Sequence, residues 1–288
     1  MIYLTPTTVK EALGLLQTGE ATLVAGCTDF FPSQRPGCQD RSILDITRVA
    51  DLRGISATGT GWRIGAATTW TDVIKAPLPP AFDGLKLAAR EVGSVQIQNA
   101  GTVAGNICNA SPAADGVPPL LTLDAEVEIA SAESVRRVPL ARFVTGVRSV
   151  DLRPGEMVIA LHVPAVSDAA RSAFLKLGSR KYLVISIAMV AVVLELDDGR
   201  IGDIRIAVGA CSPVAQRLPA LEDHLRGRTA ATVETVTIDE AGHLAPLRPI
   251  DDVRGTADYR RKAVADLCRR AVLQAMGATP RETEGDDG

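Results

Sequence analysis

Two stretches of this chain mix small residues with hydroxyl, amide and carboxylate side chains, and these are the residues best able to do chemistry. In residues 98–115 the small residues Gly101, Ala104 and Gly105 are interspersed with polar ones, which are Thr102, Asn106, Asn109, Ser111 and Asp115. Small residues let a ligand approach the backbone, and glycine also accepts a positive φ. The mixture favours a loop that holds a phosphate and a polyol, although it also suits a surface turn cluster.

The second stretch is residues 24–32, where a short apolar strand over residues 21–25 runs into Gly26, Cys27, Thr28 and Asp29. Successive backbone N–H groups can converge on an anion in such a turn. The stretch contains neither GxxxxGK[ST] nor G-x-G-x-x-G, so it is neither a P-loop nor the common dinucleotide fingerprint. Two phosphate-compatible loops fit one dinucleotide whose diphosphate lies between them, and cofactor binding is therefore our hypothesis from the residues alone.

Other chemistries find less support in the sequence. Ser111 lacks a GxSxG setting, and His162, His224 and His243 fall in a strand, a helix and a polar loop without an evident chemical neighbour. No set of histidine, cysteine and carboxylate residues has the spacing of metal ligands. The five cysteines are scattered without a C-x-x-C pair, which argues against a disulfide framework or an iron–sulfur site and for a reducing compartment.

Composition narrows the function classes further. The 288 residues can bury a large core, with 46% hydrophobic and 23% charged residues. A net charge of −3 and an aromatic content of 3% do not fit a nucleic-acid partner. We find neither a membrane span nor a secretory signal, and therefore expect a cytoplasmic protein.

The elements that must position the two stretches alternate early in the chain. Residues 9–17 read as a capped helix, residues 42–46 as a second strand in a parallel unit, and residues 82–92 as an amphipathic helix. The sequence 197–200 (DDGR) predicts a hairpin turn between two long strands. Helical patterns cover residues 213–225 and 259–276.

Because the order of the predicted strands and helices changes after residue 164, we expect a domain over residues 1–168 and a second domain over residues 169–276. The polar and acidic tail, residues 277–288, is expected to be disordered.

The sequence resembles a known family at both stretches. AGCTDFFP at residues 25–32 and TVAGNICNASPAADGVPPLLTLDAEVEI at residues 102–129 are similar to the two FAD loops of the flavoprotein (medium) subunits of molybdenum hydroxylases, as in xanthine dehydrogenase and carbon monoxide dehydrogenase. The run from residue 174 onward resembles the C-terminal domain of the same subunits. The resemblance covers about residues 1–275 and implies an α+β chain: a two-subdomain, PCMH-type FAD-binding fold followed by a smaller α+β C-terminal flavoprotein domain.

The resemblance also implies roles for individual residues. The first loop would wrap the diphosphate and ribityl chain with backbone amides, and it comprises Leu23, Val24, Ala25, Gly26, Cys27, Thr28, Asp29 and Phe30. The second wall would comprise Gly101, Thr102, Gly105 and Asn106. Cys108 would approach the cofactor through its backbone, and Asp115 would accept hydrogen bonds from ribityl or ribose hydroxyls.

Four further residues would lie around the isoalloxazine ring. Val158 or Ile159 would edge it, Lys176 would lie near its polar rim, and Tyr182 would cover one flavin face. The resemblance implies no catalytic and no metal-ligating residue in this chain, since the subunit supplies binding, orientation and tuning.

The chain departs from the family pattern at three places. Gly26-Cys27 and Ala104-Gly105 stand where the family usually has Gly-Gly, and close approach survives if Cys27 and Ala104 have negative φ. Ser186 stands where the family often has an acidic residue. Some relatives insert a cysteine-rich loop with a [4Fe–4S] cluster, which this sequence lacks.

The function implied by the resemblance is electron relay in a heterotrimer. A molybdopterin subunit would hydroxylate the substrate, a [2Fe–2S] subunit would carry electrons to the FAD held here, and NAD⁺, oxygen or another acceptor would receive them. One alternative is a stand-alone FAD oxidase of the same fold. Another is a flavin-free scaffold or nucleotide-binding protein.

Overall fold

The structure is a computed structural model that describes residues 2–33, 42–181 and 183–278. Tyr182, expected to cover a flavin face, lies outside the described residues, as do residues 279–288 of the expected tail. Gly277 and Ala278 close the last helix: their backbone N–H groups donate to the carbonyls of Gln274 and Leu273 at 3.0 and 2.9 Å. Within the described part of the chain, no helix has the length and apolarity needed to cross a membrane.

The N-terminal unit is a small parallel sheet flanked by helices. Its strands, in the order β1-β3-β2, are β1 (Tyr3–Leu4), β3 (Ser42–Asp45) and β2 (Ala21–Val24). Helix α1 (Val9–Gln17) begins at Thr8, whose hydroxyl accepts a hydrogen bond from the Glu11 N–H at 3.1 Å. The short helix α2 (Phe30–Ser33) follows β2 after the glycine turn. The predicted parallel unit is confirmed.

A five-stranded antiparallel sheet forms the second unit. Its order is β4 (Ile55–Thr58), β5 (Gly61–Gly65), β10 (Met157–Pro164), β6 (Glu126–Ala130) and β7 (Val135–Pro139). The accompanying helices are α3 (Trp70–Lys75), α4 (Asp83–Glu91), α5 (Val95–Ala100), α6 (Val103–Asn109), α7 (Val117–Thr122) and α8 (Leu140–Phe143), with 3₁₀ turns η1 (Ala50–Leu52) and η2 (Pro80–Phe82). The hairpin β8 (Val144–Gly146) and β9 (Ser149–Val150) precedes β10.

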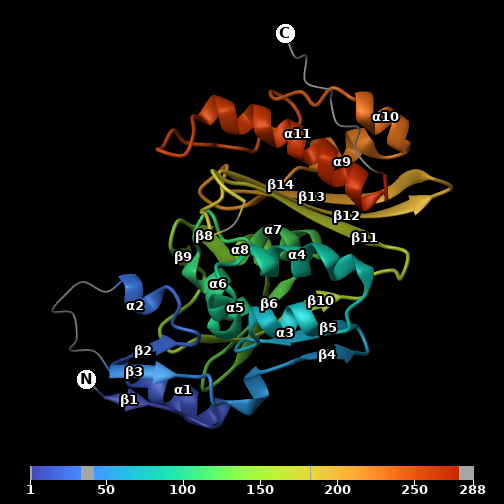
Figure 1. The fold of residues 1–288 in the computed structure, drawn as a ribbon. Helices are drawn as coiled ribbons and strands as arrows, with labels where there is room; N and C mark the ends of the chain where they lie inside the picture. Colours follow the sequence, from blue (N-terminus) through green and yellow to red (C-terminus); the bar gives the residue numbers. More distant parts are fainter. Residues whose placement is uncertain (1, 34–41, 182, 279–288) are drawn as a thin grey trace.

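The C-terminal unit is a four-stranded antiparallel sheet. Its strands are β11 (Arg171–Leu177), β12 (Ala188–Asp197), β13 (Arg200–Gly209) and β14 (Gln216–Arg217), and its helices are α9 (Pro219–Leu225), α10 (Ala230–Thr235) and α11 (Ala257–Ala275). Side chains alternate along β12, so Val190 and Val192 pack with α11 while Met189 and Ala191 pack on the other face. Figure 1 shows this sheet between α11 and the pair α4 and α7.

The expected α+β class is confirmed, with three larger sheets and helices between and beside them. The interpretation of residues 98–115 as a loop is wrong, because most of the segment is helical. The Thr102 hydroxyl caps α6 by accepting from the Gly105 N–H at 3.0 Å, and Val103 and Ile107 are buried on one side of the helix. The helix expected over residues 213–225 is also shorter, since β14 occupies residues 216–217 and α9 begins at Pro219.

Candidate cofactor-binding site

A cleft of about 1210 Å³ lies where the three units meet. Its wall is built from the turn after β2, the helices α5 and α6, the start of β10, and residues 183–185 beyond β11. The sequence-predicted residues that line it are Leu23, Val24, Ala25, Gly26, Cys27, Thr28, Asp29, Phe30, Gly101, Thr102, Gly105, Asn106, Cys108, Asp115, Val158 and Lys176. The fold thus brings the two stretches together around one space.

The two stretches also touch each other directly. A Cβ atom added at Gly26 would lie 2.0 Å from the carbonyl oxygen of Ala100, so no larger residue fits without a backbone shift. A Cβ at Gly101 would lie 3.4 Å from the Thr28 hydroxyl. The turn after β2 and the start of α6 are therefore one continuous wall.

The two departures from the Gly-Gly pattern behave differently. Ala104 lies inside α6 and has an ordinary helical backbone. Cys27 has a φ of 57°, so the condition of a negative φ is not met there. The turn after β2 needs a left-handed residue at this position, and a non-glycine residue costs about 1–2 kcal/mol there.

The chemistry of the wall fits an anionic, hydroxyl-bearing cofactor. Within the described residues, the backbone N–H groups of Gly26, Cys27 and Thr28 make no hydrogen bond, so three donors of the turn are unused. The buried Oδ1 of Asn106 likewise has no hydrogen-bond partner among these residues. Native proteins rarely leave such groups unpaired, and unused donors of a turn suit phosphate oxygens.

The Cys108 side chain is a small, uncharged part of the cleft wall. It lies on α6 at the cleft, and burial raises the pKa of its thiol to about 12. The group therefore stays a neutral thiol near pH 7. Thiolate chemistry at this position is therefore not expected.

Asp115 lies at the opposite part of the cleft in a buried polar cluster. The Lys176 ammonium donates to one carboxylate oxygen at 2.8 Å and to the Glu91 carbonyl at 3.3 Å. The Ser186 hydroxyl donates to the other carboxylate oxygen at 2.8 Å. Burial raises the pKa of Asp115 above its usual range, while Lys176 and Ser186 oppose that rise. Ser186 therefore serves as a hydrogen-bond donor to Asp115 at a position where a carboxylate would repel it.

Several lining residues carry no signal that marked them in the sequence. Glu156 is fixed by Arg136, whose Nε and NH2 groups donate to its two oxygens at 2.9 and 2.7 Å, and this pairing lowers the pKa of Glu156. Arg148, on the β8–β9 turn, also lines the cleft. Of the alternatives on β10, Val158 lines the cleft, whereas the described lining does not include Ile159.

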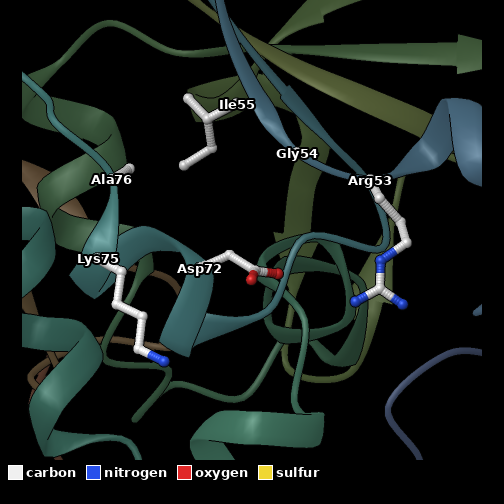
Figure 2. Close-up of a pocket in the computed structure, with 6 residues that line it drawn as sticks. All are labelled: Arg53, Gly54, Ile55, Asp72, Lys75 and Ala76. Carbon is white, nitrogen blue, oxygen red and sulfur yellow. The ribbon is translucent and has the colours of Figure 1, made fainter.

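A smaller hollow of about 420 Å³ lies between the start of β4 and the end of α3 (Figure 2). Figure 2 shows Arg53 and Lys75 on opposite sides of Asp72. The Asp72 carboxylate is already engaged at the start of α3, where it accepts from the Thr69 N–H at 3.0 Å and the Thr69 hydroxyl at 2.8 Å. These contacts account for Asp72 without a ligand.

Fold and cleft together define a protein that holds a nucleotide cofactor between an N-terminal α/β unit, a central sheet and a C-terminal sheet. The family model of the FAD-binding domain in molybdopterin dehydrogenase matches residues 1–166, and that of the CO dehydrogenase flavoprotein C-terminal domain matches residues 173–275. The chain belongs to this family of FAD-binding domains. It is an oxidoreductase subunit, and its cofactor is FAD.

Curated relatives and solved structures agree with this assignment. The chain is 32% identical over 276 residues to a putative xanthine dehydrogenase FAD-binding subunit of Escherichia coli, with 94% of each chain covered. It is 31% identical over 277 residues to a carbon monoxide dehydrogenase medium chain of Hydrogenophaga pseudoflava, covering 95% of this chain and 96% of that one. A solved carbon monoxide dehydrogenase of that organism superimposes with a TM-score of 0.87 at 30% identity, over 96% of this chain and 97% of the other.

Proposed function

We propose that this chain is the FAD-holding subunit of a three-subunit molybdenum hydroxylase and relays electrons from an iron–sulfur subunit to an external acceptor. The observation that most supports the proposal is the single cleft walled by both predicted stretches, with unused N–H donors in the turn after β2. Bound FAD supplies the redox chemistry, and the protein supplies its binding and orientation.

Different residues of the chain bind different parts of FAD. The backbone amides of residues 23–30 bind the diphosphate, with Gly101, Thr102, Gly105 and Asn106 as the facing wall. Asp115, held by Lys176 and Ser186, binds sugar hydroxyls. Val158 edges the flavin ring.

The partners follow from the relatives, which are named as medium chains or FAD-binding subunits of dehydrogenases. We extend this to a [2Fe–2S] subunit and a molybdopterin subunit for this chain, with NAD⁺ or another molecule as electron acceptor and the cytoplasm as location. The proposed domain limits are residues 1–168 and 169–276.

A stand-alone FAD oxidase needs acid–base groups that act on a substrate. All three histidines lie outside the cleft lining that the structure describes. Of the four carboxylates in the described lining, those of Asp29, Asp115 and Glu156 are each paired with a cation, and Glu91 is the fourth. The cleft is therefore better suited to hold a flavin than to activate an organic substrate.

The test is purification of the tagged full-length chain together with the products of its neighbouring reading frames. We expect flavin, iron and molybdenum to elute in one complex, and a substrate of that complex to bleach the flavin only when the iron–sulfur subunit is present. A flavoprotein that oxidises an organic substrate by itself would favour the oxidase. A chain that stays colourless after incubation with FAD would favour the scaffold.

A further inference from the structure

Arg148 joins the two walls of the cleft. Its guanidinium NH1 donates to the Asp29 carboxylate at 2.9 Å and to the Asn109 carbonyl at 3.3 Å, and also contacts the Asn109 side-chain oxygen. Asp29 follows the turn after β2, Asn109 is the last residue of α6, and all three residues line the cleft. One side chain from a third segment thus bridges the two stretches.

The backbone of the β8–β9 turn fixes Arg148 in this place. Its N–H donates to the Ala110 carbonyl, just beyond α6, at 2.9 Å. Its φ is 57°, which is unfavourable for a residue with a Cβ. Figure 1 shows the β8–β9 hairpin on the same side of the molecule as α6 and α2.

Folding stability alone does not account for this arrangement. The side chains of Arg148 and Asp29 are 52% and 54% exposed, and exposed ion pairs contribute little to stability because water screens them. The positive φ of Arg148 therefore costs conformational free energy, whereas its ion pair with Asp29 contributes little to folding stability. A need for the positive charge of Arg148 in the cleft explains the arrangement better.

The other charged side chains of the cleft show where the positive charge of Arg148 is needed. The charged side chains in the described lining are Asp29, Glu91, Asp115, Glu156, Arg148 and Lys176. Lys176 is bound to Asp115, and Glu156 is bound to Arg136, which lies outside the lining. Asp29 borders the turn with the unused N–H donors, so its negative charge would repel a diphosphate unless a cation neutralised it. Arg148 is the lining cation placed to do so.

We propose that Arg148 is a positioning residue that neutralises Asp29 and ties it to the end of α6, so that the cleft accepts the diphosphate of an anionic dinucleotide. The inference rests on the proposed function, since it assumes that FAD occupies this cleft. Arg148 acts through Asp29 and not as a direct phosphate ligand. Removal of the arginine should therefore matter only while the aspartate keeps its charge.

The test is a double-mutant cycle on the full-length chain, with FAD affinity measured by quenching of flavin fluorescence. We expect R148A to weaken FAD binding about tenfold or more in the wild-type chain, but by less than about threefold in a chain that already carries D29N. In R148A, raising the salt from about 0.05 M to about 1 M should strengthen binding, because salt screens the repulsion by Asp29.

The control is R226A, which removes an equal charge from the surface pair of Arg226 and Asp223 in the C-terminal unit, outside the cleft lining. It should leave FAD affinity unchanged. Thermal unfolding without FAD, measured for each variant, shows whether R148A is folded.

Three results would overturn the inference. They are an R148A variant with wild-type affinity, an equal loss with and without the Asp29 charge, and an R148A variant whose binding only weakens with salt. The second would make Arg148 a direct ligand, and the third would mean that Asp29 does not repel the bound FAD. If R148A does not fold, R148K keeps the charge and should bind FAD nearly as the wild type does, whereas a loss as large as about tenfold would count against neutralisation. Failure of the wild-type chain itself to bind FAD would instead refute the proposed function.

Discussion

The buried pair of Lys176 and Asp115 gives the sharpest test of how the cleft is built. The two side chains are 7% and 10% exposed, and their charged atoms lie 2.8 Å apart. In K176M the Asp115 carboxylate keeps, among the residues that the structure describes, only the Ser186 hydroxyl as a hydrogen-bond partner. Loss of one partner of a buried ion pair leaves an uncompensated charge and costs about 3–5 kcal/mol. We expect K176M to lower the free energy of unfolding of the FAD-free chain by about 3 kcal/mol at pH 8.

This loss should shrink as the pH falls. Burial already raises the pKa of Asp115, and removal of Lys176 must raise it further because the ammonium stabilises the carboxylate. A carboxyl whose pKa is higher in the folded state stabilises the fold below its unfolded pKa and loses that contribution as the pH rises. The gap between K176M and wild type should therefore widen with pH, by at most about 1.4 kcal/mol per pH unit.

Urea titrations between pH 4 and 8, followed through the fluorescence of the buried Trp70, measure the gap. The control is K262M, because Lys262 forms an exposed pair with Asp258 on α11. That variant should change stability little and without this pH dependence. A loss in K176M that is below about 1 kcal/mol at pH 8, or that is equal at both ends of the range, would refute the reasoning.

Three further variants test other parts of the cleft. C27G should raise the melting temperature of the FAD-free chain by a few degrees. It removes the strain of a left-handed non-glycine residue, which is about 0.5–1 kcal/mol after the entropic cost of glycine is subtracted. A lower melting temperature would show that the thiol stabilises the turn. G26A should weaken FAD binding about tenfold or more by calorimetry, since its Cβ meets the Ala100 carbonyl, whereas G14A on the open side of α1 should not; equal affinities would mean that this contact is not needed. E156Q should lower the free energy of unfolding by about 2 kcal/mol at pH 7, as measured by urea titration. The difference between E156Q and the wild type should vanish as the pH falls through the lowered pKa of Glu156. A difference that persists at acid pH would contradict the role given to Arg136.

Local sequence signals predicted the parts of the fold that depend on neighbours in the chain. The Thr8 cap, the strand that ends at Val24 and the turn at Asp198 and Gly199 all have short-range causes, and all are present. The loop interpretation of residues 98–115 is wrong because the polar residues there suggest a loop, whereas Thr102 caps a helix whose buried side is formed by Val103, Ala104 and Ile107.

Contacts between distant residues could not be predicted from pattern alone. Ser186 meets Asp115 across 71 positions, and Arg148 meets Asp29 across 119. No periodicity or spacing links such pairs, because the fold of the whole chain brings them together. The positive φ of Cys27 was likewise hidden, since cysteine gives no signal for a left-handed backbone.

The account depends on one FAD molecule lying against both stretches at once. Backbone hydrogen exchange of the full-length chain with and without FAD tests this directly, because exchange reports local opening at each segment. We predict that residues 24–30 and 101–109 both gain protection when FAD binds, while α11 (Ala257–Ala275) changes little. Binding of FAD that protects only one of the two segments, or neither, would contradict the account.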